Sequence, residues 1–195
     1  MKMKFQIKKG DHYSNCWLYK AYNMLYKPLL VNGDKELTNK IKFSQECVYK
    51  GLEDDVNKLF GFNISNIKGN LFEDVHEHSV RFGWRPNLNG MYIDIFSYYY
   101  INGVRKYVRI CSVIPEKFYK YKIGVYKIND IDVVEYQYRF EVTSLSNNIV
   151  IGDYKSDKFK MVDNNKFNLL ISTNNYPYFG GNIVAPQDMT ITIIS

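Results

Sequence analysis

Cysteine is scarce in this chain of 195 residues, and the three that occur, Cys16, Cys47 and Cys111, lie far apart. No Cys-x-x-Cys pair is present, which argues against a zinc knuckle and against a dithiol redox motif. A chain of this length buries about 70% of its unfolded surface, so it needs no disulfide bond or metal to hold a core. We therefore expect free, mostly buried thiols in a reducing compartment.

Long apolar runs are also missing. Residues 1–14, MKMKFQIKKGDHYS, lack the apolar segment of a secretory signal peptide. No stretch approaches the roughly 18 apolar residues that a transmembrane helix requires. We expect a single soluble domain that spans residues 1–195 and is made in the cytoplasm.

Known catalytic motifs are absent as well. The sequence contains no nucleophile elbow, no zinc-protease helix and no kinase motif. Acid pairs such as Asp130 with Asp132 and Asp153 with Asp157 are typical of turns. We expect no catalytic residue and no cofactor, and a binding or structural protein rather than an enzyme.

Aromatic residues, in contrast, are abundant: 18 Tyr and 12 Phe. Such residues favour pleated, half-buried surfaces. Apolar and polar side chains alternate with a period of two, most clearly in Asp132–Val142 and again in Met3–Lys9 and Leu37–Phe43. Such alternation is typical of an antiparallel sheet that buries one face and exposes the other to solvent. The sequence predicts an all-β fold, an antiparallel two-sheet sandwich of the jelly-roll or concanavalin/lectin-like kind.

A hairpin is predicted in the middle of a sheet. Met91–Ile101 and Tyr107–Ile114 are apolar on both faces, and Asn102-Gly103 between them fits a type I′ turn. Asn89-Gly90 predicts another tight turn just before this hairpin. Further strands are expected at Asn15–Tyr26, Ser79–Arg85, Tyr121–Ile128, Asn168–Thr173 and Met189–Ile194.

Helical spacing occurs in one place only. Val56, Leu59 and Phe60 fall on one side of a short helix predicted near residues 53–60, with acidic residues in its first turn and Gly61 after it. The polar stretch Asn63–Glu77 predicts a surface loop, and long loops on β-sandwiches often carry binding function.

A candidate ligand site centres on Arg81 and Arg85, which flank Gly83 on one face of a predicted strand. Two guanidinium groups over a glycine floor fit a phosphate or carboxylate. They fit equally well as ion-pair partners of Asp132 or Glu135. Paired glycines at 180–181 either expose backbone N–H groups to an anion or let a loop cross the sheet closely. The candidate ligand-binding residues are Arg81, Trp84, Arg85, Tyr98, Tyr100, Gly180, Gly181 and Asn182.

Histidines supply the remaining candidates for a metal site. His76 and His78 would share a face if they entered a strand, and His12 would add a third imidazole. A zinc site needs three or four ligands and usually has a stronger sequence signal. We therefore expect ordinary histidines bonded to backbone or carboxylate groups, and no metal.

The net charge of +6 permits contact with a polyanion. However, Lys and Arg are dispersed along the chain, without a basic run or an arginine-rich arm. The sequence therefore does not favour a nucleic-acid partner.

Five segments together resemble a set of small uncharacterised β-rich proteins from Bacteroidetes and their phages. These segments are Lys8–Ser14, Asp55–Phe62, His78–Arg85, Tyr98–Gly103 and Tyr178–Asn182. The resemblance carries no catalytic residue. It implies a bacterial host cytoplasm and a context of phage or host biology.

Three functions follow as alternatives. The first is a phage virion component, such as a capsid accessory protein, that acts through protein–protein contacts and self-assembly. The second is a binder of a small anionic or sugar ligand, either a lectin-like module or a protein that sequesters a nucleotide signal. The third is a metal-dependent hydrolase built on the histidines.

Overall fold

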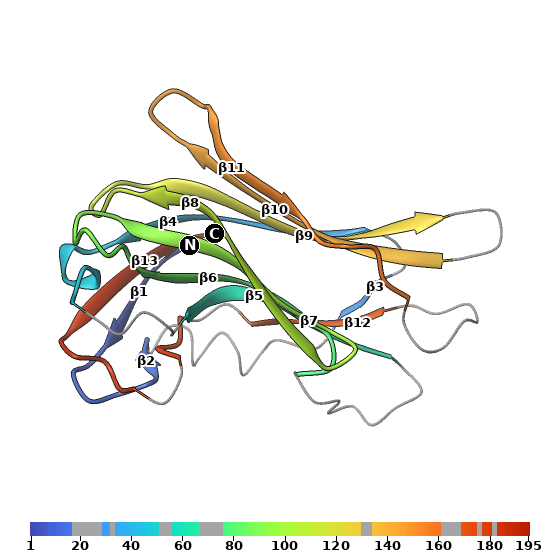
Figure 1. Ribbon diagram of the computed structural model, residues 1–195, viewed down its shortest axis with the longest axis horizontal. Coiled ribbons are helices and arrows are strands. Elements are labelled where there is room, and N and C mark those ends of the chain that lie inside the picture. Colours follow the sequence, from blue (N-terminus) through green and yellow to red (C-terminus); the bar gives the residue numbers. More distant parts are fainter. Residues whose placement is uncertain are drawn as a thin grey trace.

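Alternating side chains build a fold of two antiparallel β-sheets, stacked as layers in Figure 1. The computed structural model describes residues 1–16, 29–31, 34–50, 56–66, 76–129, 134–160, 169–174, 177–180 and 183–195. Within these residues the one helical element is a 3-10 turn, η1 (Gln45–Cys47). The expected antiparallel two-sheet sandwich is confirmed.

The larger sheet has seven strands in the order β11-β10-β9-β4-β13-β1-β2. The two chain ends meet in it, because β1 pairs with β13 and the Met1 amino group donates to the Ser195 carbonyl at 2.8 Å. Its strands are β1 (Lys2–Ile7), β2 (Ser14–Asn15), β4 (Lys35–Phe43), β9 (Tyr119–Asn129), β10 (Val134–Ser144), β11 (Val150–Lys155) and β13 (Met189–Ile194).

The smaller sheet has six strands in the order β3-β12-β5-β6-β7-β8. Strands that follow one another from β5 to β8 are also neighbours in the sheet. Asn102 and Gly103 join β7 to β8 with φ values of 50° and 74°, so the predicted hairpin is confirmed. Its predicted place in the middle of a sheet is wrong, because β8 is the edge strand and most of its residues are exposed. The strands are β3 (Leu29–Val31), β5 (Asn57–Asn66), β6 (Ser79–Pro86), β7 (Ile93–Ile101), β8 (Val104–Val113) and β12 (Leu169–Asn174).

Aromatic rings fill the space between the sheets. Phe82 on β6 lies 5.2 Å from Tyr121 on β9 and 5.3 Å from Phe140 on β10, measured between ring centroids, with near-perpendicular planes. Such edge-to-face pairs add about 0.5–1.5 kcal/mol beyond the burial of their area. The abundant Tyr and Phe residues therefore serve largely as sandwich core.

The three cysteines are free and buried. Burial raises the pKa of the Cys47 and Cys111 thiols to about 12. These two thiols therefore stay protonated at neutral pH. None of the described residues forms a helix long and apolar enough to cross a membrane.

The prediction of a helix near residues 53–60 is wrong for the part of this range that the structure describes. Residues from Asn57 onward belong to β5, and the β5–β6 register shifts between Lys58 and Gly61. Because of this bulge, Leu59 and Phe60 both enter the core, which imitates helical spacing. Residues 53–55 lie outside the described residues.

The predicted loop Asn63–Glu77 is too long at its start, because Asn63–Asn66 continue β5. Phe62 and Ile64 point into the core, while Asn63 lies on the other face of the strand. The polar character of Asn63 therefore indicates the outer face of a strand and not a loop. Residues 67–75 lie outside the described residues. The strand expected at Asn15–Tyr26 is described only at its start, where Asn15 ends β2.

Candidate functional site

Four of the predicted site residues share the outer face of the six-stranded sheet. Arg81 and Arg85 project from β6, and Tyr98 and Tyr100 from the adjacent β7, where Arg81 and Tyr98 are paired in register. The Tyr98 and Tyr100 hydroxyl groups lie 3.4 Å apart. Burial, together with the Tyr100 hydroxyl, raises the pKa of Tyr98 well above its ordinary value. The pairing of the two adjacent strands thus brings these four side chains to one face.

The glycine floor of that predicted site is not open. A Cβ added at Gly83 would lie only 2.4 Å from the Val56 side chain, so Val56 already covers this position. Arg81 donates a hydrogen bond to Asn63 at 2.7 Å, and Arg85 lies 4.9 Å from the Phe96 ring centroid. The two guanidinium groups therefore contact their own sheet instead of flanking an anion cradle above Gly83.

The acidic partners proposed for those arginines are also elsewhere. Glu135 lies on β10, in the other sheet, with its carboxylate 3.8 Å from the Lys158 ammonium. Asp132 lies outside the described residues. Trp84 faces the opposite side of β6 from the arginines and is fully buried against Phe43 in the core. Trp84 is therefore a packing residue, and its prediction as a ligand-stacking ring is wrong.

The segment around Gly180 crosses the start of β5 closely. Lys58 and Tyr178 exchange two backbone hydrogen bonds of 2.9 Å. The Gly180 N–H donates to the Asn57 side chain at 2.9 Å, and a Cβ at Gly180 would lie 2.9 Å from the Val56 carbonyl oxygen. This glycine therefore permits the close approach of two backbone segments. Of the two interpretations of the glycine pair, the structure at Gly180 agrees with the one in which a loop crosses the sheet closely. Gly181 and Asn182 lie outside the described residues.

The three histidines occupy separate environments. His12 Nδ1 lies 3.0 Å from the Phe179 carbonyl oxygen, and its ring stacks near Tyr178. His76 lies in the turn before β6 beside Tyr100, and His78 is buried with its ring stacked on Phe159. Because β6 begins only at Ser79, the shared strand face does not form. Within the described residues, no three His, Cys, Asp or Glu side chains are grouped to hold a metal ion.

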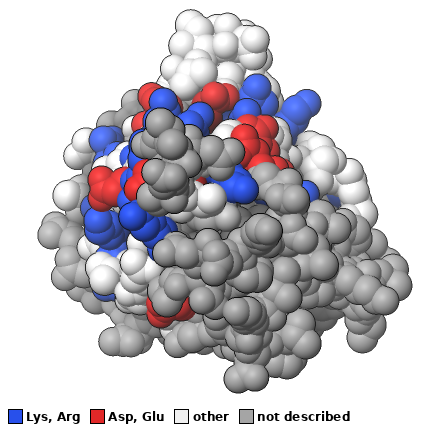
Figure 2. Space-filling view, turned by 90° about the vertical axis from the view of Figure 1, so that its right-hand side faces the viewer, with Lys and Arg blue, Asp and Glu red and all other residues white. Residues whose placement is uncertain are grey.

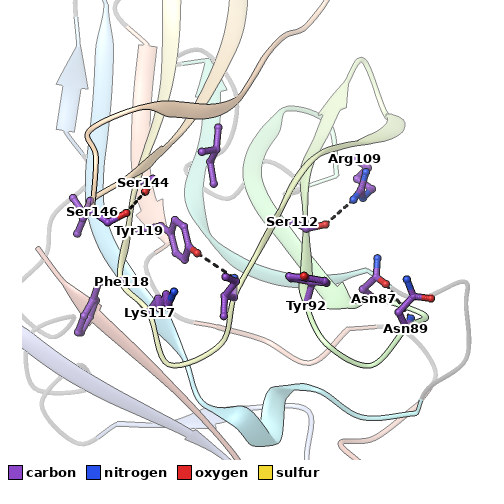
Figure 3. A pocket seen from close by; sticks show the side chains of 13 residues that line it. Asn87, Asn89, Tyr92, Arg109, Ser112, Lys117, Phe118, Tyr119, Ser144 and Ser146 are labelled. Atoms are coloured by element: carbon purple, nitrogen blue, oxygen red, sulfur yellow. Dashed lines mark hydrogen bonds between the residues drawn. The ribbon is translucent and has the colours of Figure 1, made fainter.

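A groove of about 870 Å³ opens at one end of the sandwich (Figure 3). Chain segments that are distant in sequence line it, among them β8 with Arg109 and Ser112. The β6–β7 turn contributes Asn87, Asn89 and Tyr92, the β8–β9 connection contributes Lys117 and Phe118, and the end of β10 contributes Ser144. Figure 3 shows the first group on one side of the groove and the other two groups on the opposite side. The predicted turn at Asn89-Gly90 is confirmed, with Gly90 at φ 66°.

A buried carboxylate organises the first wall of this groove. Asp94, at the start of β7, accepts a 2.5 Å hydrogen bond from Ser112 and a 3.1 Å hydrogen bond from Asn87. The Arg109 guanidinium lies 3.0 Å from the same carboxylate. Burial alone would raise the pKa of Asp94, but these contacts outweigh burial and hold that pKa below its ordinary value. Asp94 therefore fixes three polar side chains that face the groove.

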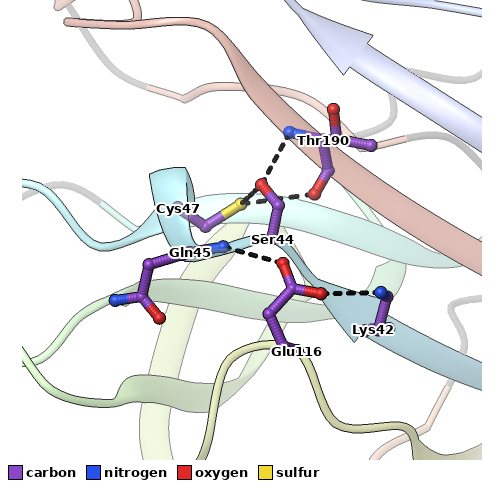
Figure 4. Close-up of polar contacts among 6 residues, drawn as sticks. All are labelled: Lys42, Ser44, Gln45, Cys47, Glu116 and Thr190. Carbon is purple, nitrogen blue, oxygen red and sulfur yellow. Dashed lines mark hydrogen bonds and ion pairs between the residues drawn. The ribbon is translucent and has the colours of Figure 1, made fainter.

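The opposite wall is fixed by Glu116, in the β8–β9 connection. Its carboxylate accepts a hydrogen bond from the Gln45 N–H at 3.1 Å and pairs with Lys42 at 2.6 Å (Figure 4). Its own N–H donates to the Phe43 carbonyl oxygen at 2.8 Å. These contacts tie the connection to the end of β4. They set the position of Lys117, the next residue, at the mouth of the groove.

The connections that contribute to the groove carry exposed apolar side chains, of which Tyr92, Ile114 and Leu145 line the groove itself. Leu88 is 76% exposed and Met91 58% exposed on the β6–β7 turn, and Ile149 is 56% exposed on the β10–β11 hairpin. The further exposed apolar residues on these loops and on the β8–β9 connection are Tyr92, Ile114, Leu145 and Val150. Figure 1 shows the β10–β11 hairpin extending beyond the body of the sandwich. We call these seven residues the apolar rim.

The two main rim segments contain no charged residue, although 24% of the chain is charged. These segments are Pro86–Ile93 (PNLNGMYI) and Val142–Gly152 (VTSLSNNIVIG). Surfaces of soluble monomers seldom gather apolar side chains in one place. The sequence alone shows that these two segments carry no charge. Only the fold shows that both segments contribute to one groove.

No protein-family model matches the chain, and no curated protein is significantly similar to it. The resemblance to proteins of Bacteroidetes and their phages therefore stays a prediction.

Proposed function

We propose that the protein is a non-enzymatic binding protein that associates with a second copy of itself through the apolar rim. The observation that carries this proposal is that seven exposed apolar side chains lie on the connections that contribute to one groove, and that three of them, Tyr92, Ile114 and Leu145, line it. The centres of stable protein interfaces are apolar and depleted of charge. The rim segments have both properties.

A second copy suits the two main rim segments because these segments are uncharged, whereas Lys117 on the opposite wall of the groove is charged. In a two-fold contact each patch faces itself, so a charged patch would oppose its own charge. Pro86–Ile93 and Val142–Gly152 bring no charge to such a contact. In the wall behind them, the Arg109 charge is compensated by Asp94 at 3.0 Å.

The test is the oligomeric mass of a rim variant. Leu145→Asp with Ile149→Asp places carboxylates on an exposed hairpin, where the fold itself loses little. We expect the wild-type protein to be an oligomer and this variant to be a monomer of 23.1 kDa, measured by sedimentation velocity. The cause is the cost of burying an unpaired charge in the contact.

Val104→Asp with Val108→Asp is the matched control. Both valines are exposed on β8, and neither lines the groove. This control variant should retain the wild-type mass. A rim variant with the same mass as the wild type would contradict the proposal.

A second candidate function is supported by the interior of the groove. Arg109 and Lys117 bring positive charge, Asn89 and Ser146 bring hydrogen-bonding groups, and Tyr92 brings a ring. Such a lining fits a small anionic ligand with a ring or several hydroxyl groups. Native mass spectrometry of gently purified protein should then show an added mass that is lost in Lys117→Gln with Tyr92→Ala. An unliganded wild-type protein would exclude this candidate.

The wider assembly is also proposed to be a phage virion, in which the protein is an accessory component. Only the resemblance of the five sequence segments supports this context. Detection of the chain in purified phage particles by mass spectrometry would test it.

A further inference from the structure

Three lysines lie in one row across the outer face of the seven-stranded sheet. Lys2 on β1 and Lys40 on β4 both pair in register with Ile194 on the strand between them. Lys40 is also directly opposite Lys120 on β9. All three side chains point away from the core, because their neighbours Met3, Ile41 and Tyr121 are buried between the sheets.

Two more lysines form the adjacent row. Lys4 on β1 and Lys42 on β4 both pair in register with Thr192 on β13. Neighbouring strands lie about 4.8 Å apart, so the five lysines cover four strands, a width of about 14 Å. We call Lys2, Lys4, Lys40, Lys42 and Lys120 the lysine face.

Most of this charge is not compensated. Lys42 pairs with Glu116 at 2.6 Å. Within the described part of the chain, Lys2, Lys4, Lys40 and Lys120 form no ion pair. Like charges placed directly opposite each other, as at Lys40 and Lys120, destabilise a sheet. The lysine face therefore concentrates positive charge at a cost to the fold.

On other parts of the surface, basic side chains lie next to acidic ones. Figure 2 shows basic and acidic side chains interspersed on the side of the molecule that it presents. Lys122, one row further along β9, pairs with Glu36 at 2.7 Å, and Lys106 pairs with Asp157 at 3.0 Å. The concentration of one sign at the lysine face is thus a local property rather than the general pattern.

We propose that the lysine face binds the phosphate backbone of a double-stranded nucleic acid, without sequence preference. Lysine acts as a point charge toward phosphate, and a duplex carries one charge per about 1.7 Å of its axis. About eight phosphates therefore lie within a 14 Å length of duplex, some of them facing the protein. This function is separate from self-association through the apolar rim.

The composition of the face favours a duplex over other polyanionic partners. The outward positions between the lysines hold Thr192 and Ile194. The ring of Phe118 beside this face is half-buried, and the Lys42 ammonium lies over it at 5.8 Å from its centroid, so it is not an open platform on which unpaired bases would stack. An anionic membrane surface is usually bound by cations together with inserted apolar or aromatic side chains, and Ile194 is only half-buried between long lysine chains. A face composed mainly of cations recognises the negative charge of its partner rather than a base sequence or an apolar surface.

The experiment is fluorescence anisotropy with duplex DNA of two unrelated sequences, titrated at several salt concentrations. We expect equal affinity for both sequences and a linear fall of log K with log salt. Lys40→Gln with Lys120→Gln should reduce the affinity roughly tenfold and the salt slope by about two, because each phosphate contact contributes about 0.9 to the slope.

Lys155→Gln with Lys158→Gln is the control, because it removes the same charge at a different place on the surface. This control should bind nearly as tightly as the wild type. Equal loss in both variants, or no binding of duplex at low salt, would overturn the proposal. Binding to vesicles of anionic lipid without binding to duplex would also overturn it, and circular dichroism shows that each variant is folded.

Discussion

Asn39 places an amide inside the sandwich. It is buried on β4, in register with Tyr121 on β9. Neither polar atom of the Asn39 side chain, nor the Tyr121 hydroxyl, has a hydrogen-bond partner among the described residues. Burying an amide without such a partner costs roughly 1–3 kcal/mol. The core therefore keeps a polar pair at the expense of stability.

Asn39→Leu should accordingly stabilise the protein. The substitution keeps the branched shape and the number of heavy atoms of the side chain and removes the unsatisfied amide, so the free energy of unfolding should rise by about 1–2 kcal/mol in urea titrations. Thr38→Leu, at the adjacent exposed position on β4, is the control and should change this free energy little. A fall in stability for Asn39→Leu would show that the amide has a partner.

Asp94 makes the stability depend on pH. Its pKa in the folded protein is held below the ordinary value, so its contribution is present above the pKa of the unfolded state and is lost as pH falls through the folded pKa. Asp94→Asn should therefore lower the urea midpoint at pH 7. The difference between variant and wild type should narrow below about pH 4.

Asp153→Asn provides the comparison for this prediction, because Asp153 is exposed on β11. It should leave the urea midpoint nearly unchanged at pH 7. If Asp94→Asn unfolds at the wild-type midpoint at pH 7, the carboxylate does not hold the groove wall together.

At the scale of elements, the β7–β8 hairpin depends on its turn. Gly103 has φ 74°, and a Cβ there would meet only the Glu77 carboxylate at an ordinary 3.5 Å. The cost of Gly103→Ala is therefore conformational, about 1–2 kcal/mol of unfolding free energy. Thermal and urea unfolding should show this loss, whereas Asn102→Gly, which permits the same turn, should cost less. Equal costs would argue against a type I′ turn.

Most strands could be predicted from the sequence because alternation reports burial directly. Val142 and Phe140 on β10, and Phe5 on β1, are buried as their period of two requires. The prediction failed where the register breaks. At the β5 bulge, Leu59 and Phe60 are consecutive core residues, a pattern that local periodicity assigns to a helix.

The candidate site could be predicted only in part. Arg81, Arg85, Tyr98 and Tyr100 share a face because two adjacent strands fix their direction. What covers that face depends on contacts that are distant in sequence, such as Val56 against Gly83. The groove needs three connections brought together by strand order, and strand order is not encoded in any local pattern.

At the scale of the whole molecule, the fold brings together charged side chains that are separate in the sequence. Lys2, Lys40 and Lys120 come from separate segments, and the sequence shows no basic run, yet the sheet aligns them in one row. Dispersed lysines do not favour a nucleic-acid partner when only neighbours along the chain are compared, because the residues of this row are separated in sequence. The charge-free rim loops and the lysine face are two different kinds of surface, which fits two different partners.

Self-association through the apolar rim should be visible in the mass of the protein in solution. The most direct test is sedimentation velocity of the unmodified protein from low to high micromolar concentration. We predict a species whose mass is a fixed multiple of 23.1 kDa and whose fraction rises with concentration. A mass of 23.1 kDa at every concentration would contradict the claim.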